Sequence, residues 1–147
     1  MSDYLTCIKT FATLEIFHDT LEPQAITAVL GITPTRSFRR GDTHGHGERV
    51  TPYRVNTWLL SSEGSVASHD SLRHIEWLLG KVEPRHAVLL ELQKQSYRMD
   101  ISCYWLSKSG HGGPTLTPDI MRRLGKLELA VWFDVYFDDI NDDKPSA

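Results

Sequence analysis

One pattern occurs twice in this chain: Thr20-Leu21-Glu22-Pro23 precedes Leu30-Gly31, and Thr115-Leu116-Thr117-Pro118 precedes Leu124-Gly125. Each copy has a proline suited to the first turn of a helix and a glycine suited to the position just after its end. Apolar residues recur near one face of each copy, at Ile26, Val29 and Leu30 and at Ile120, Met121 and Leu124. The copies lie near opposite ends of the chain beside strand-like sequence, which predicts one compact domain with a pseudo-repeat.

The composition is that of a soluble globular domain, with 147 residues, 40% hydrophobic and 24% charged. We expect one domain over residues 1–137 and a flexible acidic tail over 138–147. The net charge of −3 disfavours nucleic-acid binding, which needs clustered lysine and arginine. No apolar run approaches the roughly 20 residues of a membrane span, and no signal peptide is visible. We therefore expect a cytoplasmic protein without a membrane partner, with Cys7 and Cys103 reduced and buried.

Hydrophobic periodicity predicts the remaining elements. Strand-like alternation covers residues 4–17, 53–62, 97–106 and 127–137, and helical spacing covers 72–82, with Ser71 as a possible N-cap. Pro84 stops that helix and starts another. The order favours an α+β two-layer sandwich, with a mainly antiparallel four-stranded sheet, helices on one face and a ferredoxin-like topology.

The last predicted strand carries an unusual polar row, Trp132, Asp134 and Tyr136. Aspartate is a poor strand former. If the row is buried, the carboxylate needs a partner, for which Arg54 and Arg98 are candidates. If the row faces solvent, it joins Trp58 and Tyr104 in an aromatic and polar patch suited to a partner or a small ligand. A structural aspartate is the simpler of these interpretations.

The segment 32–52 is predicted to be a long loop with Arg40 and Asp42 as binding candidates. His44 and His46, with Asp42 and Glu48, are the candidate metal ligands, because metals need converging nitrogen and oxygen donors. The pair stands among three glycines, which do not hold side chains rigidly, so we interpret the loop as solvated and predict no metal and no cofactor. Its arginines, opposed to the acidic tail, could steer an acidic partner.

Two further chemistries are disfavoured. Gly110-His111-Gly112-Gly113 is similar to an oxyanion loop of lipases and esterases, but the chain has no Gly-x-Ser-x-Gly nucleophile elbow. An aromatic sheet face with arginines also raises RNA recognition. The required basic-glycine-aromatic motif is absent, however, and the domain is not basic.

Several segments, taken together and in order, resemble one known family. They are Thr20-Leu21-Glu22-Pro23 with Leu30-Gly31-Ile32-Thr33-Pro34-Thr35, Arg40-Gly41-Asp42, Trp58 with Ser61-Ser62, Leu72-Arg73-His74-Ile75 with Leu78-Leu79 and Glu83-Pro84, and Leu116-Thr117 with Leu124-Gly125-Lys126-Leu127 before Phe133-Asp134-Val135-Tyr136. The set is similar to DUF4279, a bacterial family of unknown function. The resemblance implies a single-domain α/β protein without assigned activity or cofactor, and it draws attention to Asp134 without giving it a role.

We therefore expect a non-catalytic binding or interaction module, with a protein partner or a second copy of the chain. By analogy with small acidic bacterial domains, an immunity-like role fits. Trp58, Trp132, Asp134, Tyr136, Arg40 and Asp42 are its predicted binding residues. The alternative is a small-molecule or metal-binding enzyme with a pocket around Asp134 and the histidine-rich loop, which would require convergent polar groups in a concavity.

Overall fold

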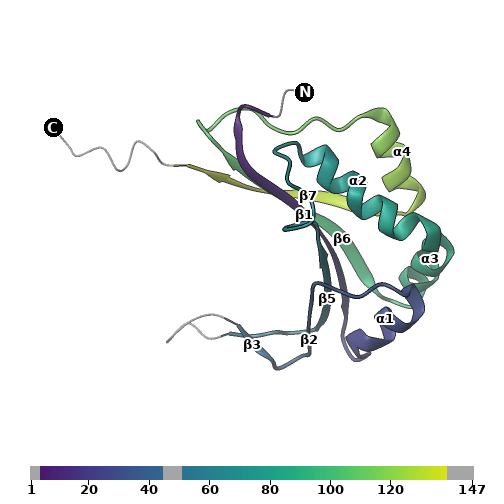
Figure 1. Ribbon diagram of the computed structural model, residues 1–147. Coiled ribbons are helices and arrows are strands. Elements are labelled where there is room, and N and C mark those ends of the chain that lie inside the picture. The colour runs from purple at the N-terminus through teal and green to yellow at the C-terminus, as the bar shows by residue number, and fades with distance from the viewer. Residues whose placement is uncertain (1–3, 45–50, 139–147) are drawn as a thin grey trace.

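The computed structural model describes residues 4–44 and 51–138, with only the backbone described for His44. In chain order the elements are β1 (Cys7–His18), α1 (Pro23–Leu30), β2 (Arg36–Phe38), β3 (Thr43–His44), β4 (Thr51–Pro52), β5 (Asn56–Ser61), α2 (Ser71–Val82), the 3₁₀ turn η1 (Glu83–Arg85), α3 (His86–Lys94), β6 (Arg98–Ser107), α4 (Pro118–Lys126) and β7 (Ala130–Phe137) (Figure 1). The α+β class is confirmed. No helix in the described ranges is long and apolar enough to cross a membrane.

The main sheet has five strands in the order β2-β5-β1-β6-β7, so the prediction of four strands is wrong. The additional strand is β2, which lies in the segment predicted to be a loop and pairs antiparallel with β5. Its three residues are too few to show an alternating pattern in the sequence. β1 pairs antiparallel with β5 and β6, but β7 runs parallel to β6. The sheet is therefore mixed, and a ferredoxin-like topology is not confirmed.

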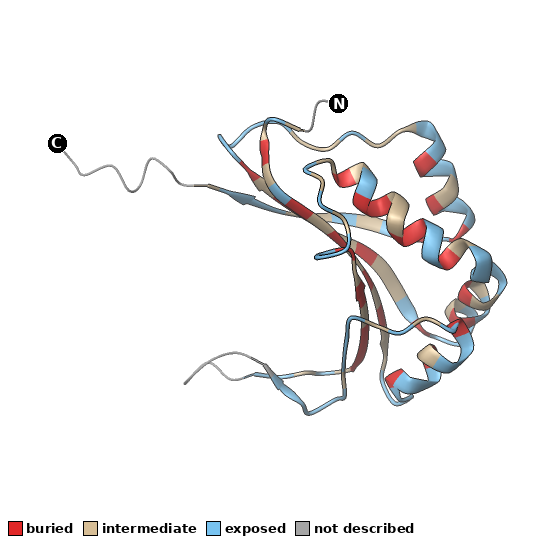
Figure 2. Cartoon of the chain, in the orientation of Figure 1, coloured by how far each residue is buried: buried red, intermediate tan, exposed pale blue. Residues whose placement is uncertain are grey.

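Helices α1, α2, α3 and α4 lie on one side of this sheet (Figure 1). Most residues of β1, β5 and β6 that point toward them are buried, whereas most of those on the opposite side are intermediate or exposed (Figure 2). On β1, for example, Ala12, Leu14 and Ile16 are each 0% exposed, and the residues between them are partly exposed. We call these two sides of the sheet the covered face and the open face.

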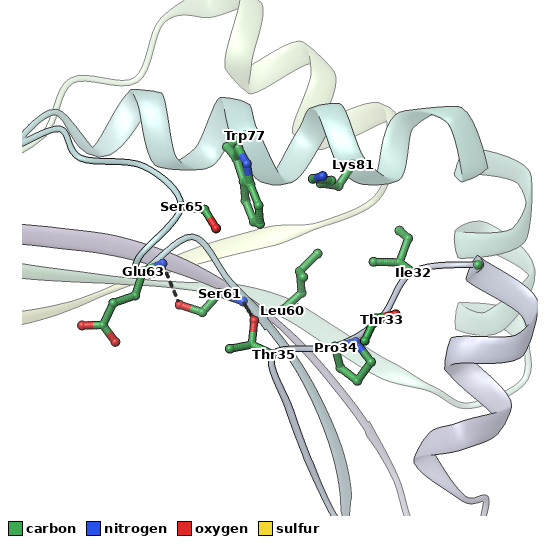
Figure 3. A pocket seen from close by; sticks show the side chains of 11 residues that line it. Ile32, Thr33, Pro34, Thr35, Leu60, Ser61, Glu63, Ser65, Trp77 and Lys81 are labelled. Carbon is green, nitrogen blue, oxygen red and sulfur yellow. Dashed lines mark hydrogen bonds between the residues drawn. The ribbon is translucent and has the colours of Figure 1, made fainter.

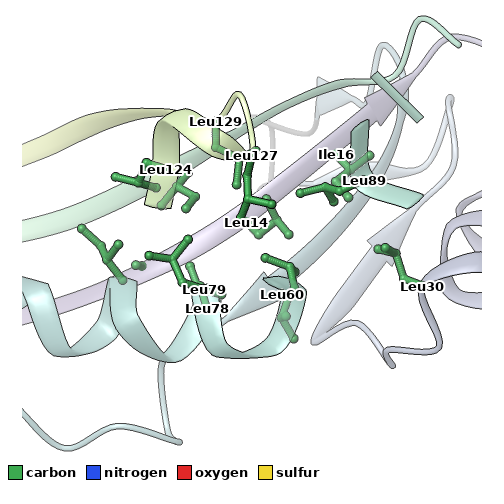
Figure 4. Close-up of a cluster of buried hydrophobic side chains, with 14 of the residues drawn as sticks. Leu14, Ile16, Leu30, Leu60, Leu78, Leu79, Leu89, Leu124, Leu127 and Leu129 are labelled. Atoms are coloured by element: carbon green, nitrogen blue, oxygen red, sulfur yellow. The ribbon is translucent and has the colours of Figure 1, made fainter. Parts of the chain in front are cut away.

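Leucine and isoleucine side chains from strands and helices fill the space above the covered face (Figure 4). Leu14 and Leu60 project from the sheet, and Leu78 and Leu79 from α2 meet them. Each fully buried side chain of this size stabilises the fold by roughly 1.5–3 kcal/mol. The core, rather than helix propensity, therefore holds these short helices in place.

The repeated helices differ at their ends. α1 ends as predicted, with Gly31 in the left-handed conformation at φ 67° and its N–H bonded to Thr27 O. α4 instead continues through Gly125 to Lys126, so the predicted stop at Gly125 is wrong. Gly125 has open space around it, and the left-handed residue after this helix is Glu128 at φ 54°. The pseudo-repeat thus extends to the helix starts but not to both ends.

A buried polar network fixes α2 onto the covered face. Asp70, not Ser71, caps the helix by accepting from the N–H of Leu72 at 3.0 Å. The Ser71 hydroxyl instead contacts Thr10 Oγ1 on β1 at 2.7 Å. Ser62 Oγ accepts from the N–H of Ala12 at 2.9 Å and lies 2.6 Å from His74 Nδ1. Side chains from α2 thereby satisfy polar groups that would otherwise be buried without partners.

Both cysteines are buried thiols outside any disulfide, as predicted. Cys103 lies on the covered face of β6, 3.9 Å from Thr10 Oγ1, and burial raises the pKa of its thiol. Such a thiol is a poor nucleophile. The two cysteines therefore serve as small core residues.

Candidate functional site

The open face gathers the polar row of β7 with residues from β6 and β1. Strand register places Asp134 beside Tyr104, Tyr104 beside Phe11, and Asp100 beside Glu15. The row itself turns away from the helices, with Trp132 46% and Tyr136 49% exposed. Of the two predicted environments for this row, the structure shows the solvent-facing one. Asp134 is half-buried between the two aromatic residues.

Three aromatic rings form a continuous strip across this face. Phe11 and Tyr104 stack with ring centroids 4.9 Å apart and an interplanar angle of 13°. Tyr104 then meets Tyr136 at 5.2 Å and 32°. Stacked and tilted aromatic pairs of this kind stabilise the contact between their rings by about 0.5–1.5 kcal/mol each. The strip is therefore a preformed aromatic surface that spans β1, β6 and β7.

An acidic group adjoins the strip. The Trp132 indole N–H lies 3.2 Å from Glu15 Oε1 and 3.2 Å from Asp100 Oδ1. The two carboxyl groups come from neighbouring strands and share one donor. Asp134 stands on the same face and adds a third negative charge to their surroundings. We call Glu15, Asp100 and Asp134 the acidic group.

The acidic group alters the protonation of Glu15. Partial burial, together with the hydrogen bond and charge of Asp100, raises the pKa of Glu15 from 4.5 to about 7. The Trp132 hydrogen bond opposes this rise, and the charge of Asp134 adds to it. Asp134 also raises the pKa of Tyr136. Near neutral pH the charge of the open face therefore depends on the protonation of Glu15.

The sequence did not single out Glu15 and Asp100. Glu15 stands between the buried residues Leu14 and Ile16. An acidic residue inside an apolar central strand is the feature of the sequence that could have indicated a functional role for Glu15. Asp100 alternates with buried residues in the same way on β6. Their meeting depends on the register between β1 and β6, which is set by tertiary structure.

Trp58 does not belong to this surface, and the prediction that it would is wrong. Its side chain is 0% exposed on the covered face of β5, where its indole N–H donates to Thr27 Oγ1 on α1 at 3.0 Å. β5 presents Trp58 and Leu60 to the helices because strand residues alternate between faces. Trp58 is a structural residue that joins α1 to the sheet.

The expected arginine partners of Asp134 are engaged or placed elsewhere. Arg98 forms an ion pair with Asp19 at 3.3 Å. Arg54 is exposed in the segment between β4 and β5. The clearest neighbour of Asp134 is instead the hydroxyl of Tyr136, two residues along the same face. The carboxylate of Asp134 therefore stands in an aromatic setting.

Arg40 and Asp42 lie far from Asp134 along the sheet. They follow β2 at one edge, Asp134 is on β7 at the other edge, and β5, β1 and β6 separate them. Asp42 closes a turn by accepting from the N–H of Arg39 at 2.8 Å, and the Arg40 N–H donates to Asn56 Oδ1 at 2.7 Å. These contacts explain both positions as parts of a turn. The predicted binding residues thus do not form one site.

Of the four candidate metal ligands, only Asp42 lies fully within the described residues. His46 and Glu48, and the side chain of His44, lie outside the described residues. Across residues 4–44 and 51–138, no group of three or more histidine, cysteine, aspartate or glutamate side chains is placed to hold a metal ion. Asp134 lies on β7 at one edge of the main sheet, whereas His44 lies on β3 of the separate two-stranded sheet β3-β4, which follows β2 at the opposite edge.

A separate groove of about 500 Å³ lies between α2 and the segment that joins α1 to β2 (Figure 3). Trp77 and Lys81 descend from α2, with Lys81 Nζ 5.2 Å from the centre of the Trp77 ring. Thr35 Oγ1 accepts from the N–H of Ser61 at 2.9 Å, and Ser61 Oγ accepts from the N–H of Glu63 at 3.1 Å. Each hydroxyl keeps its own proton to donate. The groove can therefore contact a small polar ligand.

Comparison with protein-family models gives one family, described as "Domain of unknown function (DUF4279)", which matches residues 8–138. The chain belongs to this family. No curated protein and no solved structure matches the chain. The matched range of the DUF4279 domain contains the whole sheet except Cys7, together with every residue of the open-face surface.

Proposed function

We propose that this DUF4279 domain is a non-catalytic binding module that receives a protein partner on its open face. The observation that carries the proposal is the meeting of an aromatic strip with an acidic group on a sheet face that the helices leave uncovered. Tyrosine and tryptophan supply most of the binding free energy at many interfaces. Acidic side chains beside them favour specific encounter with a complementary charge.

The geometry favours recognition over chemistry. The open face spreads its polar groups over three strands, and its two closest carboxyl groups share one indole donor. A catalytic site usually needs a concavity that gathers its groups around a reacting atom. A broad surface needs only complementary shape and charge. We further propose a cytoplasmic location, in which an immunity-like role would use such a surface against one cognate protein.

The test compares partner recovery by matched variants. Trp132→Ala with Tyr136→Ala removes aromatic side chains from the open face, and Val29→Ala with Met121→Ala removes exposed apolar side chains from the helices. Purification from the native source should recover a defined partner with the second pair and lose it with the first. Equal recovery by both pairs would contradict the proposal.

A second candidate function is small-molecule binding in the Trp77 groove. The observation that favours it is the combination of an aromatic wall, a lysine and hydroxyl donors around about 500 Å³, a volume typical of ligand sites. Native mass spectrometry of the gently purified protein should show a bound small molecule. Trp77→Ala and Lys81→Ala should each lose that molecule, whereas Met121→Ala should retain it.

A further inference from the structure

β7 is an edge strand of the main sheet. Among residues 4–44 and 51–138, it forms the last position in the sheet order and pairs with β6 on one side. The N–H of Asp138, just beyond the end of β7, donates to Ser107 O at the end of β6. Because the N–H and C=O of successive residues point alternately to the two sides of a strand, those of Val131, Phe133, Val135 and Phe137 point away from β6.

This edge lacks the usual protection against strand addition. Proteins shield edges with short strands, proline, lysine or a bulge. β2 at the opposite edge has three residues. β7 has eight residues in unbroken register, and Asp134 is its only charged side chain. The difference makes β7 the edge that can accept a further strand.

The second half of β7 exposes apolar side chains on both sides. Val135 is 45% exposed and Phe137 is 59% exposed on the side where the helices lie. Tyr136 is 49% exposed on the open face. Figure 1 shows β7 extending past α4 toward the C-terminal end of the chain. A strand added here would cover apolar surface on both sides as well as satisfy backbone groups.

The charges around β7 indicate which kind of strand could be added to it. The open face beside β7 holds the acidic group, and Glu128 and Asp138 flank the strand. Two cations near this region are already paired, Arg98 with Asp19 at 3.3 Å and Lys9 with Glu63 at 2.6 Å. A second copy of β7 would bring further acids against this surface, whereas a basic segment would complement it.

We propose that the partner docks by adding an extended, basic segment to β7 as a sixth strand of the sheet, with its lysine or arginine side chains over the acidic group. This inference rests on the proposed function and specifies how the open face is used. The backbone of the partner pairs with the outward groups of β7, and its alternate apolar residues contact Val135 and Phe137. Main-chain bonds then supply affinity and the acidic group supplies specificity.

Hydrogen exchange with a probe peptide tests the inference directly. The probe is a short blocked peptide of alternating lysine and valine, and its control has glutamate in place of lysine. The amides of Val131, Phe133, Val135 and Phe137 should exchange quickly in the free protein and become protected when the lysine peptide binds. Those of Trp132, Asp134 and Tyr136 should be protected in both states, because they face β6. The glutamate peptide should protect none of the outward amides.

Matched variants separate backbone pairing from side-chain contact. Val135→Pro removes an outward N–H without breaking the bonds to β6, and it should weaken binding of the lysine peptide by about tenfold or more. Val135→Ala retains that N–H and should weaken binding by less than about threefold. Asp134→Asn should weaken binding and reduce its dependence on salt. If Val135→Pro unfolds the protein, the hydrogen-exchange pattern of the wild-type protein with the lysine peptide still tests strand addition.

The outcomes distinguish the two proposals. Binding of the lysine peptide without protection of the outward amides would overturn strand addition. Loss of the native partner by the Trp132 and Tyr136 variants would, in that case, still support the open face as the binding surface. Equal binding of both peptides would overturn the charge argument. Protection of the outward amides that rises with protein concentration alone would show a second copy on β7 and overturn the basic partner.

Discussion

The covered face and the open face of the main sheet both carry tryptophan, but in the core on one face and at the surface on the other. On the covered face Trp58 and Trp105 are 0% and 1% exposed, and Trp58 belongs to the hydrophobic core beneath the helices. On the open face Trp132 is 46% exposed and donates to two carboxyl groups. All three tryptophans alternate with other residues along their strands. The difference arises from what lies above each face, which shows that residue type alone does not separate a core from a binding surface.

Polar groups differ between the faces in the same way. On the covered face the hydroxyls of Thr10 and Ser62 find short hydrogen bonds with groups from α2 and neighbouring strands. On the open face Glu15 and Asp100 bring like charges together, and the pKa of Glu15 rises. The first arrangement stabilises the fold, and the second works against it at high pH. A surface that retains such an arrangement is a candidate for function.

The largest expected effect comes from a charge introduced on the covered side. Leu78→Asp would bury an unpaired carboxylate at a position that is 1% exposed, and we expect a loss of more than about 4 kcal/mol of stability. Tyr136→Asp makes the same new side chain on the open face and should cost less than about 1 kcal/mol. Denaturant unfolding measures both. Similar losses for the two variants would remove the distinction between the faces.

A smaller effect should follow from the buried polar network. Ser62→Ala removes the oxygen that accepts from the N–H of Ala12 and contacts His74. Both partners are then left in the core, which should lower the free energy of unfolding by about 1–3 kcal/mol. Ser65→Ala, at an exposed position in the next turn, is the control and should change it by less than about 0.5 kcal/mol. Equal values would show that the network does not fix α2.

Glu15 gives the open face a dependence of stability on pH with a definite sign. Its pKa is raised from 4.5 to about 7, so between these values the folded protein binds more protons at Glu15 than the unfolded chain does. The free energy of unfolding should therefore fall as pH rises through this window. Glu15→Gln should remove that fall and stabilise the protein at about pH 8 by about 1 kcal/mol, allowing for solvent screening. Thermal unfolding across pH measures the effect.

The matched control for this variant is Glu91→Gln, which removes one exposed carboxylate from α3. A wild-type stability curve that rises through the same pH window would contradict the arrangement of Glu15 and Asp100. So would a curve that Glu15→Gln leaves unchanged.

The smallest expected effect concerns the indole donor alone. Trp132→Phe keeps an aromatic ring on the open face but removes the N–H that lies 3.2 Å from Glu15 and from Asp100. Because that hydrogen bond lowers the pKa of Glu15, the variant should raise it further. Carbon-detected NMR titration of the Glu15 carboxyl group measures the change. Trp77→Phe, on α2, is the control, and a lower pKa in Trp132→Phe would contradict the assigned role.

Local patterns predicted which residues share a side of a strand, because alternation is a property of the extended backbone. The row of Trp132, Asp134 and Tyr136 was identified in this way. Which side the helices cover depends on how the chain crosses the sheet, so Trp58 was placed on the wrong surface. β2 escaped prediction because its three residues become a strand only by pairing with β5. Glu15 and Asp100 escaped it because their contact requires a register between strands distant in sequence.

The order of strands has a consequence for how the protein is made. β1 is synthesised first but occupies the centre of the sheet, and its partners are β5 and β6. During synthesis, β1 lacks one of its two neighbouring strands until β6 is complete at Ser107. β7 follows only after α4. Pairings between segments so distant in sequence are formed slowly. Between the synthesis of β5 and that of β6, β1 therefore has a neighbour on one side only, and such an unpaired strand edge favours aggregation.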